Sequence, residues 1–256
     1  MRQPRLTSVV LAAAALAIIG VGPLPVSAQA QQVALEPYQP VTITLPPVVN
    51  DPTYEAFRKQ LADVAQKKDR AALARLVAAS FFWIPEDMDV VDKTKSAIDN
   101  LAKAIGLDRQ GAPGWDTLAS FALERTGRAD PQRAGVICAP AEPGFDDHAA
   151  DELTNATHTE ASDWGYPVRD GVEVRATREP NAATIDKLGL YLVRILPDDS
   201  PANAVLLTSV KVMTPAGKIG FVAFDSILPL LSEQMCYLKD DGGWKIAGFL
   251  GGDAGQ

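Results

Sequence analysis

The chain has 256 residues, of which 47% are hydrophobic and 22% charged, so it can build one large core or two small ones. Its formal charge of −8 argues against a nucleic-acid partner, because phosphate binding needs clustered Lys and Arg. With only two His and two Cys, a four-ligand zinc site is close to excluded, and we expect neither a metal nor another cofactor.

Residues 1–28 have the composition of a secretory signal peptide. Two arginines near the start precede an apolar run over 8–22, which is shorter than the roughly 20 residues that a membrane-spanning helix needs. Small residues before Gln29 and Gln31 offer two cleavage sites. We therefore expect a periplasmic or secreted protein without a transmembrane segment after signal removal. Losing both arginines takes the formal charge from −8 to −10.

Between residues 29 and 127 the residue pattern changes from one typical of an extended segment to one typical of helices. The segment 29–50 is rich in Gln, Pro and Val, and its prolines exclude a helix, so we expect a Pro-rich linker. Asp51 followed by Pro52 is a typical helix start. Apolar residues then recur at helical spacing as far as Gly127. This pattern predicts a small helical domain over residues 51–127.

The remaining sequence predicts a connector and then a β domain. Residues 128–163 contain Pro, Gly and acidic residues and few large apolar ones, which is typical of a connector. Over residues 164–252 short segments of alternating apolar and polar residues are separated by turn signals such as Asp241-Gly242. Several short strands at regular spacing favour a small barrel or sandwich. The expected fold class is thus α+β.

The order of these strands resembles the bacterial Src-homology-3-like domain. Val172–Ala176, which reads V-E-V-R-A, matches the opening strand of that family, and Leu188-Gly189 with Val193 matches the segment after its long first loop. Gly217–Val222 and the turn at Asp225–Ile227 match the later strands. The resemblance covers about a third of the chain and implies a small β-barrel over residues 164–252. The terminal hairpin goes beyond the usual barrel, as an extra element of this domain.

A second resemblance competes with this interpretation. A first helix with Phe57, the segment Asp69–Leu73 and the final Gly243–Ile246 are similar to a nuclear-transport-factor-2-like cone. That family needs one continuous curved sheet between these ends. The strands expected from residue 171 to residue 230 do not supply such a sheet, so the barrel is preferred.

The first resemblance implies a contact surface lined by aromatic side chains between two loops of the barrel. The candidate ligand-binding residues are Trp164, Tyr166, Tyr191 and Phe221. Trp164 and Tyr166 are expected at the surface, because Trp164-Gly165-Tyr166-Pro167 reads as a loop before the first strand. The alternative is that half or more of these aromatic residues belong to the core.

Signals for catalysis are weak, and no catalytic residue is assigned. Cys138 is the only candidate nucleophile outside the barrel, and His148 and His158 are the only histidine bases. Their segment is acidic and loop-like, and the chain has no Gly-x-Ser-x-Gly string. The acidic residues do not form a recognisable pair for glycoside hydrolysis.

The two cysteines are expected to form one disulfide. Cys138 and Cys236 are an even pair in a chain that is predicted to be exported, where disulfides persist. Each lies in a short strand-like segment, so the two segments could run side by side. Two buried free thiols are the alternative.

These observations favour an exported, soluble, non-enzymatic envelope protein whose barrel binds peptide or cell-wall material. Its expected partner is peptidoglycan, or a peptide or protein, and not nucleic acid. One alternative is a structural module that docks a partner. The other is a hydrolase whose site the sequence does not reveal.

Overall fold

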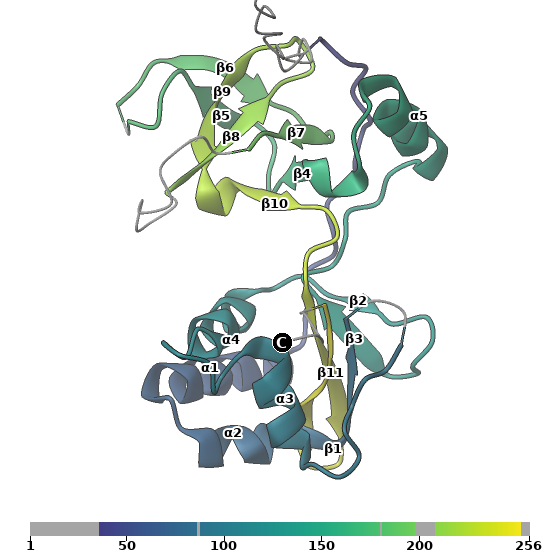
Figure 1. The fold of residues 1–256 in the computed structure, drawn as a ribbon, viewed down its shortest axis with the longest axis vertical. Coiled ribbons are helices and arrows are strands. Elements are labelled where there is room, and N and C mark those ends of the chain that lie inside the picture. Colours follow the sequence, from purple (N-terminus) through teal and green to yellow (C-terminus); the bar gives the residue numbers. More distant parts are fainter. Residues whose placement is uncertain (1–35, 86–87, 180, 198–207, 252–256) are drawn as a thin grey trace, which may run out of the picture. The chain divides into compact units, whose positions relative to one another are not determined.

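The computed structural model describes residues 36–85, 88–179, 181–197 and 208–251 (Figure 1). The predicted signal peptide, its cleavage sites and the start of the Pro-rich linker lie outside these residues. Over the described residues the chain forms five α-helices and twelve strands, which confirms the α+β class. None of the described helices is both long enough and apolar enough to cross a bilayer. The strands form two sheets, each with its own buried apolar residues.

The first sheet combines strands from distant parts of the sequence. Its order is β1-β12-β11-β3-β2; β1 runs parallel to β12 and the other pairs are antiparallel. The strand bounds are β1 Val77–Ile84, β2 Arg128–Ala129, β3 Val136–Ala139, β11 Gln234–Asp240 and β12 Gly243–Leu250. The terminal hairpin β11–β12 therefore occupies the middle of this sheet.

Four helices pack on the first sheet (Figure 1). Asp51 and Asp69 cap the first two by accepting hydrogen bonds from the backbone N–H groups of Thr53 and Ala72. The core that they share with the sheet includes Leu61 and Phe249, both fully buried. The helix bounds are α1 Pro52–Lys67, α2 Arg70–Leu76, α3 Ala97–Ile105 and α4 Gly114–Leu123.

A separate helical domain over residues 51–127 is therefore not confirmed. The aromatic residues Phe81, Phe82 and Trp83 belong to strand β1 and not to a helical segment. The terminal hairpin belongs with these helices and not with the barrel, because both of its faces are apolar. Tyr237 and Phe249 are buried against the helices, whereas Cys236 and Ala247 pack with Phe82 on the other face. Such a hairpin needs an apolar partner on each side.

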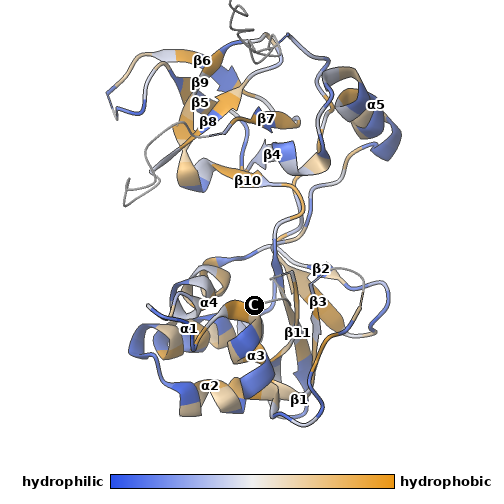
Figure 2. Cartoon of the chain, viewed as in Figure 1, coloured by the Kyte–Doolittle hydropathy of each residue, from blue (hydrophilic) through white to orange (hydrophobic). Residues whose placement is uncertain are grey.

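The second sheet is formed by residues that intervene between β3 and β11. Its seven strands have the order β10-β4-β7-β8-β9-β5-β6, and no described pairing joins β10 to β6, so the sheet is not a closed barrel. Helix α5, Asp147–Thr157, contributes Leu153 to the core of this sheet. Figure 2 shows hydrophobic residues on strands of both sheets and hydrophilic ones on α5. The bounds are β4 Trp164–Pro167, β5 Val172–Arg175, β6 Thr184–Leu188, β7 Val193–Ile195, β8 Ser209–Met213, β9 Ile219–Ala223 and β10 Ile227–Pro229.

The described part of the Pro-rich linker is more than a tether. Tyr38, Val41 and Ile43 are buried in the core of the second sheet, and the Tyr38 hydroxyl donates to the Met213 carbonyl oxygen over 3.0 Å. Val49 donates its backbone N–H to the carbonyl oxygen of Arg125, two residues after α4 ends. The prolines of this segment exclude a helix, as predicted, but the apolar residues between them pack.

The nuclear-transport-factor-2-like cone was set aside because the strands between residues 171 and 230 do not continue one curved sheet. The second sheet is an insertion, so these strands need not belong to such a sheet. Strands of residues 164–229 form a sheet of their own, and the first sheet is completed by β11 and β12 without them. The segments that carry the second resemblance, around Phe57, Asp69 and Trp244, all lie with the first sheet. Both resemblances nevertheless stay predictions.

Candidate functional site

Two of the predicted surface aromatic residues are buried. Trp164 and Tyr166 are 1% and 2% exposed, because Trp164–Pro167 is strand β4 and not a loop. The Trp164 indole N–H donates to Thr159 Oγ1 over 2.8 Å, and the Tyr166 hydroxyl donates to the Ala141 carbonyl oxygen over 3.2 Å. Burial raises the pKa of Tyr166 above its ordinary value. The expectation that these two residues lie at the surface was wrong, and they have the environment of core residues.

The other two predicted residues are half-buried and differ in their surroundings. Tyr191 packs against the core of the second sheet, and its hydroxyl lies 3.5 Å from the Lys187 carbonyl oxygen. Phe221, in β9, packs with none of the buried clusters and lines a cavity. The structure therefore does not bring the four aromatic residues into one groove: Phe221 lines one cavity, and Trp164 borders a different one beside α5.

This cavity has a volume of about 370 Å³, at the lower end of the range for small-molecule sites. We name it the arginine cavity. It lies over strands β5, β8 and β9, and the lining residues that bear on its chemistry are Arg169, Glu173, Arg175, Arg178, Ser209 and Phe221. Sequence analysis identified only Phe221 among them.

Strand register explains why cations gather around Phe221. Phe221 pairs with Arg175 of β5 on one side and with Lys211 of β8 on the other. Residues directly opposite in neighbouring strands point to the same face, so these three side chains share one face of the sheet. The Arg178 guanidinium lies over the ring, 4.6 Å from its centroid. Alternation places Val174 and Val222 on the opposite, buried face.

The charges of the arginine cavity are predominantly positive. Among its described lining residues there are three arginines and one glutamate, and the Arg175 guanidinium lies 3.8 Å from the Glu173 carboxylate. Arg175, Arg178 and Lys211 also interact with further groups of the chain, which helps to hold them in place. Arg169 is exposed in the turn between β4 and β5, two residues before Gly171, whose φ of +72° favours glycine.

Ser209 also lines this cavity, and its own hydroxyl group is buried in an unusual state. The residue is 8% exposed, and its hydroxyl oxygen is buried without a hydrogen-bond partner. Leaving a buried hydroxyl unsatisfied costs about 1–3 kcal/mol, so such a group calls for an explanation. The hydroxyls of Tyr54, Thr214 and Tyr237 share this state within the described residues, but they do not line the arginine cavity.

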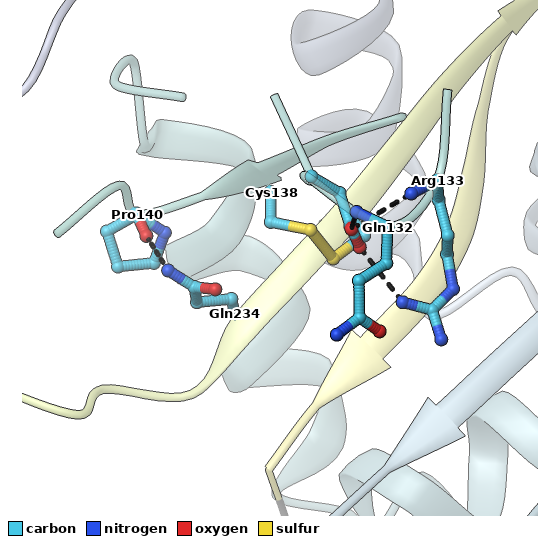
Figure 3. The surroundings of a disulfide bond; sticks show 7 residues. Gln132, Arg133, Cys138, Pro140 and Gln234 are labelled. Atoms are coloured by element: carbon cyan, nitrogen blue, oxygen red, sulfur yellow. Dashed lines mark hydrogen bonds and ion pairs between the residues drawn. A yellow bond between two sulfur atoms is a disulfide. The ribbon is translucent and has the colours of Figure 1, made fainter. Parts of the chain in front are cut away.

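The predicted disulfide is present and joins neighbouring strands. Cys138 of β3 lies opposite Cys236 of β11, with a Cα–Cα distance of 4.0 Å (Figure 3). Nearby, the Gln234 side-chain amide donates to the Pro140 carbonyl oxygen over 2.7 Å. Because the bond consumes both cysteines, Cys138 cannot act as a thiolate nucleophile with His148 or His158 as its base.

A second cavity of about 370 Å³ lies beside the disulfide. Arg128, Arg133, Glu142 and Gln234 contribute its polar lining. Arg133 forms an ion pair with Asp130 at 3.0 Å, and its guanidinium lies 4.1 Å from the centroid of the Phe82 ring. Burial raises the pKa of the Glu142 carboxyl. Since Arg133, Glu142 and Gln234 have hydrogen-bond partners within the fold, this cavity is a weaker candidate than the arginine cavity.

Across the described residues, no group of three or more His, Cys, Asp or Glu side chains is placed to hold a metal ion. Comparison with known proteins adds no assignment: no protein-family model matches the chain, and neither does any curated protein. The candidate site therefore rests on the chemistry of the arginine cavity. Its sequence signal was the alternation of β5, which places Glu173 and Arg175 on the face opposite to Val172 and Val174.

Proposed function

We propose that this chain is an exported, non-enzymatic binding protein, and that its second sheet binds peptide or cell-wall material in the arginine cavity. The observation that carries the proposal is the half-buried Phe221 ring in one cavity with a described lining that contains three arginines and one glutamate. Aromatic surface gives contact area, and placed polar groups give orientation, which is the usual construction of a small-ligand site.

Two observations support binding in an oxidising compartment over catalysis. The Cys138–Cys236 disulfide suits the periplasm or the exterior, where such bonds persist. Of the described lining of the arginine cavity, no residue is a histidine or a cysteine, which are the commonest general base and the most reactive nucleophile. The hydrolase alternative has no comparable observation in its favour.

A partner-docking function is the second candidate, and exposed apolar residues favour it. Phe224 is 57% exposed, and Val168 is 37% exposed. Both are joined by backbone hydrogen bonds to the cavity lining, Phe224 to Thr208 and Val168 to Ser226. A protein partner that covered these side chains would bury apolar surface next to the cavity.

Retention on purified peptidoglycan tests the first function. We expect the protein to stay bound in moderate salt, and Phe221→Ala to weaken retention because it removes the ring from the cavity. Leu123→Ala is the matched control, since Leu123 is a 75% exposed apolar residue of α4, outside the second sheet. Wild-type protein that flows through would refute peptidoglycan binding. Retention that is lost with Phe224→Ala and kept with Phe221→Ala would refute the arginine cavity as the binding site and assign binding to the exposed apolar residues beside it.

A further inference from the structure

A cavity of about 370 Å³ is lined by helix α5 and by residues from the core of the second sheet. We name it the α5 cavity. Phe145, Ala150 and Ala161 are half-buried or exposed and give it accessible apolar surface. Trp164 and Leu192 also line it, but each is only 1% exposed and contributes almost none. The volume is at the lower end of the range for small-molecule sites, so it suits one long side chain and not an extended ligand.

Helical spacing brings two carboxylates to the α5 cavity. Four of its lining residues come from α5 at intervals of three and four positions: Asp147, Ala150, Asp151 and Thr154. Residues at these intervals share one face of a helix. Asp147 and Asp151 are exposed, and they are the only charged residues in the described lining. The cavity therefore combines apolar surface with two exposed negative charges.

The fold gives these two carboxylates no partner. Asp146 caps α5, and the Glu152 carboxylate lies 3.5 Å from His148 Nδ1. Within the described residues, the carboxylates of Asp147 and Asp151 have neither a hydrogen bond nor an ion pair. Like charges four positions apart destabilise a helix. Asp147 is compensated by its place in the first turn, where a negative charge is favourable, but Asp151 is not.

The surrounding sequence makes this region strongly acidic. From residue 134 to residue 168 the chain contains neither Lys nor Arg. The same segment contains seven acidic residues, Glu142, Asp146, Asp147, Asp151, Glu152, Glu160 and Asp163. A cationic group is therefore attracted to α5, whereas an anionic group is repelled.

Apolar surface beside two carboxylates complements a group that is aliphatic along its length and cationic at its end. The side chains of Lys and Arg have this construction, and they commonly place their stems on apolar surface while the charged head stays in water. We propose that the α5 cavity binds a Lys or Arg side chain of a peptide segment, with its stem against Phe145 and Ala150 and its cationic head at Asp147 and Asp151. The described linings of the α5 cavity and the arginine cavity have no residue in common, so this inference goes beyond the proposed function.

Chemical-shift titration of the ¹⁵N-labelled chain with three peptides tests the inference. The first probe is N-acetyl-Ala-Lys-Ala amide, which should shift the amide signals of α5. Norleucine in place of Lys keeps the stem and removes the ammonium, and it should bind roughly two- to fivefold more weakly for each ion pair lost. Diaminobutyric acid in place of Lys keeps the ammonium and removes two methylenes. It should bind more weakly by up to roughly fourfold for each methylene.

Charge variants separate the α5 cavity from the general surface of the helix. Asp151→Asn should weaken binding of the Lys peptide and reduce its salt dependence. Its melting temperature should not fall, since the carboxylate has no partner within the described fold. Glu152→Gln is the matched control, because it removes the same charge from the same helix and does not line the cavity. Phe221→Ala, in the arginine cavity, should leave binding of the Lys peptide unchanged.

The outcomes distinguish this inference from the proposed function. Equal affinity for the Lys and norleucine peptides would overturn recognition of the cation. Equal affinity for the Lys and diaminobutyric acid peptides would overturn the contribution of the cavity, and equal loss in Asp151→Asn and Glu152→Gln would assign binding to general surface charge. Absence of shifts in α5 with all three peptides would overturn the inference as a whole. Flow-through on peptidoglycan would overturn the proposed function and leave this inference intact.

Discussion

Replacing both cysteines with serine, Cys138→Ser with Cys236→Ser, measures how much stability the disulfide contributes. That contribution depends on whether the two sheets unfold together. The disulfide closes a loop with a sequence separation of 98, and the second sheet lies within that loop. In the chain-entropy model a loop of that length is worth about 4.7 kcal/mol if the whole loop is disordered in the unfolded state. If the second sheet stays folded when the first unfolds, the flexible part of the loop is short, and the value falls to about 3 kcal/mol, as for a 15-residue loop.

Thermal unfolding followed by calorimetry distinguishes these values. At about 2–4 °C for each kcal/mol in a chain of this size, we expect the double serine variant to melt roughly 6–20 °C below the wild type. The transition of the first sheet should move, and that of the second sheet should stay, because the bond joins β3 to β11 only. Reduction of the wild type is the control and should give the same shift. An unchanged melting temperature after complete reduction would refute the reasoning.

Two further substitutions test a close contact in the first sheet and the burial of a carboxyl group. A Cβ atom at Gly248 would clash with the Phe82 ring, so Gly248→Ala should destabilise the fold by roughly 1–3 kcal/mol in urea titrations, and Phe82→Leu should recover part of that loss. Burial raises the pKa of Glu142 in the folded state, so its ionisation costs stability as the pH rises from the ordinary glutamate value through the raised one. Glu142→Gln should therefore unfold at a higher temperature than wild type at pH 7 and lose that advantage at pH 4; an advantage that is constant with pH would contradict this explanation.

Local features of the fold were predictable because neighbouring residues determine them. Asp51 begins a helix as expected, since it caps a backbone N–H group of the turn that follows it, and Asp69 caps the next helix in the same way. Val172–Arg175 forms a strand with one buried face, as its alternation indicates. The disulfide followed from the number of cysteines and the strand-like character of both segments.

The assignment of strands to sheets was not predictable from these patterns. Periodicity identifies Gln234–Asp240 and Gly243–Leu250 as a hairpin, but it does not say which partners cover its two apolar faces. Strand β12 pairs with β1 across more than 150 positions of sequence, a contact that leaves no local signal. Trp164 was misplaced for a related reason, since Gly165 and Pro167 resemble a turn but extend along β10.

Arg169 and Ser209 show why the site was only partly predictable. A lone arginine in a turn and a serine at the start of a strand carry no motif, and both line the cavity only because of the fold around β5, β8 and β9. Phe221 was identifiable because the family resemblance places an aromatic residue near it. The search for aromatic side chains alone therefore missed the charged side chains that line the cavity.

The pairing of β3 with β11 leads to a last prediction, that the first sheet folds without the inserted segment. Ala139 lies opposite Met235, so Pro140 and Gln234 face each other at the ends of these strands. A two-residue link between them is the length of the commonest β-hairpin turn, and Asn-Gly has the backbone freedom that this turn needs. We expect a chain in which Asn-Gly replaces residues 141–233 to fold cooperatively and to form the Cys138–Cys236 bond.

The shortened chain also tests where the terminal hairpin belongs. Thermal unfolding and thiol titration are the measurements, and deletion of residues 234–252 from the full chain is the control. If the hairpin completes the first sheet, this control loses the transition of the helices, because Tyr237 and Phe249 are part of their core. In the shortened chain the disulfide closes a loop of only about eight residues and contributes about 2.5 kcal/mol in the chain-entropy model. The hairpin would instead belong with the inserted segment if the helices stayed folded in the control and the shortened chain had two free thiols and no cooperative transition.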